Sequence, residues 1–94
     1  MIEAMKRELT LTDLQNVFLR AIETHEEYIG IRIEMPNLEL PEVIINPRKN
    51  FKEKLEYYLS AYDNDLKLKS CKNIKITGFM YGSNYQEIQD CLNC

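Results

Sequence analysis

Hydrophobic residues recur along this chain with two different periods, and each period predicts one kind of element. Between residues 14 and 22 they recur three or four positions apart, which is typical of an amphipathic helix. From residue 28 to residue 35 they recur at every second position, which is typical of a half-buried strand. The apolar helix positions are Leu14, Val17, Phe18, Ala21 and Ile22, and the apolar strand positions are Ile29, Ile31, Ile33 and Met35.

The predicted first helix carries signals at both ends. Thr12, followed three residues later by Gln15, fits a capping box, so we expect the helix to begin there and to end near Glu26. His25 falls in the last turn, where a cation interacts favourably with the helix dipole, and we interpret it as structural rather than catalytic. Residues 1–10 either extend this helix or form a flexible N-terminal arm.

A second strand is predicted after a turn at Pro36. The alternation of apolar residues shifts across Pro41, which cannot donate to a ladder, so we expect a bulge or an edge position there. Together the two strands predict an antiparallel hairpin. The apolar residues of the second strand are Leu38, Leu40, Val43, Ile44 and Ile45.

A Lys-rich helix is predicted next. It starts either at Asn46, with Pro47 in its first turn, or at Asn50, which is followed three residues later by Glu53. The sequence Asp63-Asn64-Asp65 lacks the Gly and Glu of a calcium loop, and we interpret it as the turn that ends this helix. The apolar stripe of the helix comprises Phe51, Leu55, Tyr58, Leu59 and Tyr62.

A third strand over residues 73–81 and a short last helix complete the predicted order α-β-β-α-β-α. Ser83 and Gln86 fit a capping box for this last helix. The order predicts a small two-layer α+β domain over residues 1–94, with the longer helices on one sheet face, a more polar second face and a frayed tail over residues 90–94. In the third strand, Ile74, Ile76 and Met80 are expected on one face, and Lys75, Thr77, Phe79 and Tyr81 on the other.

The composition supports one globular unit and narrows the function classes. Of 94 residues, 45% are hydrophobic and 29% are charged, which argues against disorder. No apolar run approaches the ~18 residues of a membrane span, and the N-terminus lacks the apolar core of a signal peptide. We therefore expect a cytoplasmic protein that does not bind a membrane.

Positive charge is concentrated in the middle of an acidic chain. Residues 47–75 carry eight bases against four acids, although the net charge of the whole chain is −3. Lys49, Lys52 and Tyr57 are predicted to share one flank of the helix, and Lys75 and Tyr81 one face of the third strand. Lysines beside aromatic rings favour a small anionic ligand such as a nucleotide, whereas an ordinary solvated helix surface remains the simpler interpretation.

Candidate catalytic and metal-binding groups are sparse. Cys91 and Cys94 form a C-x-x-C pair at the C-terminus, but only Cys71 and His25 remain to complete a zinc site, and neither has the required spacing. We interpret the three cysteines as free thiols and expect no metal and no cofactor. Because the sequence contains no phosphate-binding loop and no motif with an activated nucleophile, it predicts a protein that is not an enzyme.

The sequence from Ile45 to Leu66, continued from Lys72 to Phe79, resembles small accessory proteins encoded by phages and prophages of Gram-positive bacteria. In layout the chain is also similar to compact α+β anti-CRISPR proteins, although it lacks the strong surface negativity with which some of those mimic nucleic acid. The resemblance implies a phage or prophage protein that binds a host protein or a protein–nucleic-acid complex and inhibits a bacterial defence system. It carries over no functional residue.

Two binding functions follow from these expectations. The first is the non-enzymatic binding of a host macromolecule, and the second is the sequestration of a small phosphorylated ligand. The candidate binding residues are Lys49, Lys52, Tyr57, Lys75, Phe79 and Tyr81. For either function we expect a homo-oligomer, formed through an edge strand near Pro41 and aromatic residues on the outer sheet face.

Overall fold

The computed structural model describes residues 9–93 and confirms the α+β class and the predicted order of elements. A two-residue strand, β3, is added between the second predicted helix and the long strand β4. The elements are α2 (Leu11–Glu23), β1 (Tyr28–Glu34), β2 (Glu42–Pro47), a single 3-10 turn η1 (Arg48–Asn50), α3 (Phe51–Ala61), β3 (Lys67–Leu68), β4 (Cys71–Gly82) and α4 (Tyr85–Asn93).

The four strands form one antiparallel sheet in the order β2-β1-β4-β3. The predicted hairpin of β1 and β2 is confirmed, and β2 lies at an edge of the sheet. The prediction that the second strand includes Leu38 and Leu40 is wrong, because pairing with β1 stops at Glu42 and both leucines lie exposed in the connecting loop. Pro36 and Pro41, which have no N–H to donate, bound this loop.

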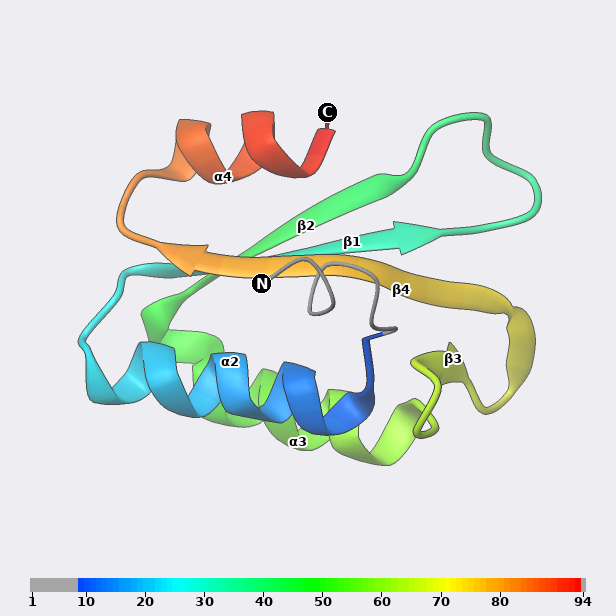
Figure 1. Ribbon diagram of the computed structural model, residues 1–94, viewed down its shortest axis with the longest axis horizontal. Coiled ribbons are helices and arrows are strands. Elements are labelled where there is room, and N and C mark those ends of the chain that lie inside the picture. The colour runs from blue at the N-terminus through cyan, green and yellow to red at the C-terminus, as the bar shows by residue number, and fades with distance from the viewer. Residues whose placement is uncertain (1–8, 94) are drawn as a thin grey trace, which may run out of the picture.

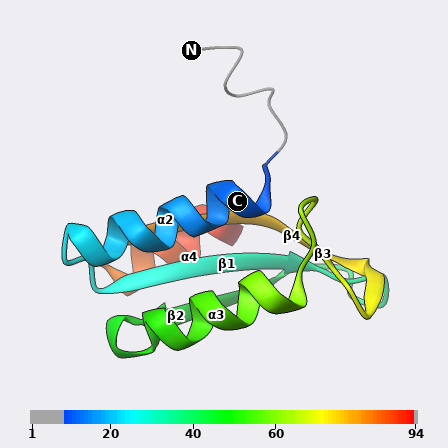
Figure 2. The same ribbon diagram turned by 90° about the horizontal axis from the view of Figure 1, so that it is seen from below.

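Helices α2 and α3 lie side by side on one face of the sheet, as Figures 1 and 2 show. Their facing rings pack closely: the ring centres of Phe18 and Phe51 lie 6.0 Å apart at an interplanar angle of 87°. This layer holds the main hydrophobic core, which comprises Leu14, Phe18, Ala21, Ile29, Ile31, Ile33, Phe51, Tyr58, Tyr62, Leu66 and Ile76.

The ends of α2 differ from the sequence prediction. The N-cap is Thr10 rather than Thr12: the Thr10 side chain accepts from Asp13 N (3.3 Å), and the Asp13 carboxylate accepts from Thr10 N (2.8 Å). Asp13 at the fourth position of the box takes the place of the predicted Gln15. The helix ends at Glu23, earlier than predicted, because His25 adopts a left-handed backbone conformation (φ 60°).

The Lys-rich helix begins with the 3-10 turn η1 and becomes α-helical at Phe51, which fits the second of the two predicted starts. The Asn50 side chain makes no capping hydrogen bond, so this start does not depend on the cap that the sequence suggested. Lys49 and Lys52 therefore lie in its first two turns.

A bulge in β4 corrects the predicted faces of the third strand. Arg32 pairs with Gly78 but Ile33 pairs with Ile76, so Thr77 is an extra residue and the alternation shifts by one. Phe79 and Tyr81 consequently pack against the main core, on the same face as Ile74 and Ile76. Met80 lies on the opposite face, because it pairs with Gly30.

Helix α4 covers this opposite face and adds a third layer to the predicted two (Figure 1). Its buried residues Ile88 and Leu92 lie directly over Gly30. A Cβ atom at Gly30 would lie 2.4 Å from Ile88 Cγ2 and 2.6 Å from Leu92 Cδ1, so only glycine permits this approach. The helix is N-capped by Asn84, whose side chain accepts from Glu87 N (3.0 Å).

The predicted tails fall largely at the limits of the described chain. Residues 1–8, most of the predicted N-terminal arm, and Cys94 lie outside it. Residues 90–93, predicted to be part of a frayed tail, belong to α4. Within residues 9–93, no helix combines the length and the apolar character needed to cross a membrane.

Candidate functional site

A small basic cavity lies where the end of α2 meets the start of α3. It has a volume of about 260 Å³ and is lined by Ile22, Arg48, Lys49, Phe51 and Lys52. Lys49 and Lys52 are exposed, and among residues 9–93 neither forms an ion pair. Two candidate binding residues are thus brought together over an apolar floor.

The third base of this cavity, Arg48, has a structural role that the sequence did not reveal. Its guanidinium donates to the main-chain oxygens of Ala21 (3.3 Å), Ile22 (3.2 Å) and Glu26 (3.0 Å). Its own N–H donates to Glu27 O (2.9 Å). The side chain therefore caps the C-terminus of α2, where a cation is favoured.

His25 does not supply the cation at this helix end, contrary to the sequence expectation. Its Nδ1 lies 3.0 Å from Arg48 Nη2, and because guanidinium only donates, Nδ1 is the acceptor. Arg48 provides the positive charge, and His25 orients it. The structural interpretation of His25 is retained, with a different partner.

Tyr57 lies on another flank of α3, away from this cavity. Lys52 and Tyr57 are five residues apart, which places them about 140° apart around a helix. Tyr57 is 48% exposed, and its ring contacts Tyr58 (5.2 Å between centres) and Tyr62 (6.4 Å) edge to face. Lys54 Nζ lies 5.9 Å from the Tyr57 ring centre. The predicted shared flank of Lys49, Lys52 and Tyr57 is not formed.

Tyr58 and Tyr62, whose rings contact Tyr57, both have raised pKa values. Burial raises the pKa of Tyr62 to about 12, with smaller contributions from the nearby Tyr57, Tyr58 and Glu42. Burial also raises the pKa of Tyr58, and its polar neighbour Asn46 opposes this rise only in part. The two buried rings that flank Tyr57 are therefore uncharged at neutral pH and anchored in the core.

Lys75 and Tyr81 line separate cavities. Tyr81 borders an open groove of about 550 Å³, whose other lining residues, Asn16, Val17, Leu19, Arg20 and Glu23, belong to α2. Lys75 lines a different cavity, together with Leu66 and Thr77. It lies six residues before Tyr81 in β4, which corresponds to about 20 Å along the strand. Phe79 packs against the main core beside Tyr81, so these two aromatic residues stay together while Lys75 is separated from them.

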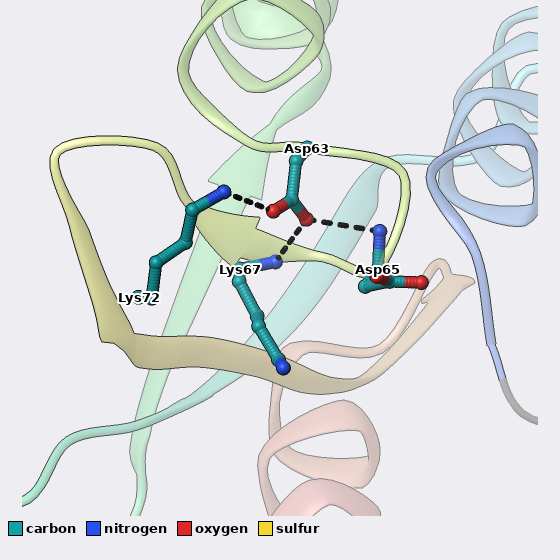
Figure 3. A network of polar contacts seen from close by, with 4 residues as sticks. All are labelled: Asp63, Asp65, Lys67 and Lys72. Atoms are coloured by element: carbon teal, nitrogen blue, oxygen red, sulfur yellow. Dashed lines mark hydrogen bonds and ion pairs between the residues drawn. The ribbon is translucent and has the colours of Figure 1, made fainter.

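The turn after α3 is organised by a carboxylate, as interpreted from the sequence. Asp63 Oδ1 accepts from the main-chain N–H groups of Asp65 (2.9 Å) and Lys67 (3.0 Å), and Oδ2 forms an ion pair with Lys72 (Figure 3). These partners, above all Lys72, lower the pKa of Asp63 to about 2. The network closes the loop between α3 and β3, and both carboxylate oxygens of Asp63 have partners within the chain.

The cysteines do not meet in the described part of the chain. Cys71 begins β4 and Cys91 lies in α4, and both are exposed free thiols. No group of three or more potential metal ligands occurs among residues 9–93. The C-x-x-C pair cannot be placed, because Cys94 lies outside the described residues.

Comparison with known proteins finds no matching family model, no matching curated protein and no matching solved structure. The candidate surfaces therefore have to be weighed on their own chemistry. They are the basic cavity at Lys49 and Lys52, the exposed ring of Tyr57, and the groove at Tyr81. The sequence did not indicate the groove, because the bulge that directs Tyr81 toward α2 has no signal of its own in the alternation.

Proposed function

We propose that this chain is a binding protein without catalytic chemistry, which engages a macromolecule of a bacterial host cell and inhibits a defence system. The observation that carries the binding function is Tyr57, a half-exposed ring held on two sides by buried tyrosines. A preordered aromatic side chain loses little entropy on binding and is typical of interface hot spots. The phage or prophage origin rests on the sequence resemblance alone.

The surroundings of His25 support a function without catalysis. A histidine that acts as a general base needs a free ring nitrogen beside a nucleophile. Here Nδ1 accepts from Arg48, whose guanidinium also donates to the main-chain oxygens of Ile22 and Glu26 at the end of α2. The pair serves the fold.

Affinity capture from a lysate of a Gram-positive host tests the proposed binding. We expect the wild-type chain to capture a specific partner and Tyr57→Ala to lose it, because truncation of a hot-spot ring costs about 2 kcal/mol or more, roughly thirtyfold in affinity. Tyr85→Ala is the matched control, since Tyr85 is 51% exposed on α4 and packs edge to face against Tyr28 (5.6 Å). Equal capture by the wild type and Tyr57→Ala would reject Tyr57 as the anchor.

A second candidate function, the sequestration of a small phosphorylated ligand, is favoured by the basic cavity. Two lysines with no ion-pair partner among residues 9–93 border about 260 Å³, which suits a phosphate group better than a whole nucleotide. The main-chain oxygens at the C-terminus of α2 would repel an anion in this cavity, but the Arg48 guanidinium neutralises this helix end.

Calorimetry with inorganic phosphate and with a panel of nucleotides tests whether this cavity binds a phosphorylated ligand. We expect Lys49→Glu and Lys52→Glu to abolish binding, whereas Lys54→Glu, on the Tyr57 flank, should leave it unchanged. Absent binding, or binding that none of the three variants alters, rejects this second function.

A further inference from the structure

Among the described strands, none covers the outer edge of β4 over its last residues. β3 pairs with β4 only as far as Lys75, and the last contact is Ile76 N donating to Leu66 O (2.9 Å). Within residues 9–93, no strand pairs with the outer edge from Gly78 to Gly82. An open edge of this kind is a template for another strand.

The register shows which backbone groups of β4 point toward this outer edge. Arg48 N donates to Glu27 O, so alternate residues of β1 from Glu27 onward direct their backbone groups to β2. Gly30 and Arg32 therefore direct theirs to β4, where they pair with Met80 and Gly78. The N–H and C=O groups of Phe79 and Tyr81 consequently point outward, away from β1.

The other edge of the sheet is protected at its end. By the same alternation, Pro47 in β2 faces outward, where a ladder would need the N–H that proline lacks. The stretch from Gly78 to Gly82 contains no proline and no charged residue, which are the usual protections of an edge. The sequence expectation of an interface near Pro41 therefore moves to the opposite edge.

We propose that a second copy of this chain pairs with the open edge of β4, antiparallel and about a two-fold axis at Met80. Phe79 of each copy would face Tyr81 of the other, and each symmetry-related pair would exchange both of its backbone hydrogen bonds. The five-residue open stretch, Gly78–Gly82, maps onto itself under this axis, so the contact ends where β3 begins.

The groove above this edge fits the same partner. It runs between α2 and Tyr81, and it presents apolar Val17 and Leu19 together with the charged pair Arg20 and Glu23. The two-fold axis would bring the two copies of α2 alongside each other in opposite directions. The outer flank of each α2 carries both a base, Arg20, and an acid, Glu23, so the two flanks complement each other in charge across the interface.

The symmetry also explains why the assembly would stop at two copies. A two-fold contact uses the same edge of both copies. Among the described strands this leaves the two β2 edges outside, since the far side of the short β3 bridges to Tyr62. Because Pro47 removes an outward donor from each of these, further strand addition is disfavoured and the dimer closes.

Sedimentation velocity over a range of concentrations tests the dimer, and charge exchange tests its geometry. We expect a dimer in the wild type, at least about tenfold weaker dimerisation in Arg20→Glu and in Glu23→Arg, and recovery in the double variant. Both side chains are exposed, so the variants should fold. Equal dimerisation in all four proteins would overturn the proposed arrangement.

Amide hydrogen exchange at low and high protein concentration locates the contact. The amides of Phe79 and Tyr81 should become protected as the dimer forms, and those of Val43 and Ile45, which face outward on β2, serve as the control. Protection of Val43 and Ile45 instead would overturn the proposal in favour of the β2 edge. A monomer at all concentrations would overturn it too, and protected Phe79 and Tyr81 amides in that monomer would show that another segment of the same chain covers the edge.

Discussion

The two faces of the sheet are covered in opposite ways. The α2/α3 face is filled with large side chains, among them Phe18, whose ring lies 6.0 Å from those of Phe51 and Tyr58. On the α4 face, by contrast, the helix can approach the sheet because several strand positions have no side chain. All three glycines of the chain lie on this face: Gly30 and Gly82 under Ile88, and Gly78 under the Arg32 guanidinium.

On each face, an arginine holds the end of a helix. Arg48 holds the end of α2 through several main-chain oxygens. Arg32 donates to Leu92 O at the end of α4 (3.3 Å) and to Thr77 Oγ1 and Thr77 O in the bulge (3.0 Å each). Both helix ends thus depend on one arginine, and the faces differ in that one gains stability from buried volume and the other from close approach. The difference can be tested face by face.

Removal of a large side chain from the α2/α3 face should have the largest effect. We expect Phe18→Ala to lower the free energy of unfolding by about 3–5 kcal/mol, because it removes a fully buried ring and leaves a cavity. Urea denaturation measures the loss. Leu40→Ala, at an exposed position in the loop between β1 and β2, should change it by less than about 0.5 kcal/mol. Similar losses in both variants would contradict the assignment of the core to this face.

Addition of a side chain should be the damaging change on the α4 face. We expect Gly30→Ala to cost about 1–3 kcal/mol, because its methyl group overlaps Ile88 Cγ2, which sits on a stiff β-branched side chain. Gly82→Ala is the matched control, since its Cβ would meet Ile88 at an ordinary 3.4 Å. Amide exchange should show the loss in α4 and not in α2. A neutral Gly30→Ala would mean that α4 does not rest on the sheet as described.

The α2/α3 face could be predicted from the sequence, because its large buried side chains recur with the periods of a helix and of a strand. The spacing of Leu14, Phe18 and Ala21 and the alternation of Ile29, Ile31 and Ile33 identified most of the buried residues. Helix, hairpin and the long strand followed from the same pattern. The helix ends were less certain, since Thr10 and Thr12 both fit a cap and only the tertiary structure selects between them.

The α4 face could not be predicted, because a helix that approaches the sheet over glycines leaves no pattern of hydrophobic residues in the strands. Glycine at residue 30 looked like a polar-face position in an alternating strand, and nothing local indicated that Ile88 would lie on it. The bulge at Thr77 was equally hidden, since a strand of alternating residues does not reveal which partner skips one. This single inserted residue moved Phe79 and Tyr81 from the predicted outer face to the core, and it separated the candidate site residues.

The two arginines should show smaller, local effects, each confined to its own face. We expect Arg48→Met and Arg32→Met each to cost about 1–2 kcal/mol, because the methionine keeps the apolar stem but removes charged hydrogen bonds to main-chain oxygens. Amide exchange should increase in the last turn of α2 for the first variant and in that of α4 for the second. Lys69→Met, at an exposed position, is the control. Loosening of both helices by either variant would show that the faces are coupled.

The smallest effect at neutral pH, and the most selective, is expected at Tyr62. Its folded pKa of about 12 lies above the ordinary value of 10, so the stability that the neutral phenol contributes is complete below pH 10 and is lost as the pH rises from 10 towards 12. Tyr62→Phe should therefore change little at pH 7 and flatten the decline in the free energy of unfolding between pH 10 and 12. Tyrosinate absorbance should follow the ionisation, and Tyr85→Phe, on the α4 face, is the control. The α2/α3 face would then be the face that loses stability at alkaline pH, because its buried tyrosines have to ionise. If the decline were unchanged in Tyr62→Phe but flattened in Tyr85→Phe, the α4 face would be the alkali-sensitive one, and the contrast between the faces would be reversed.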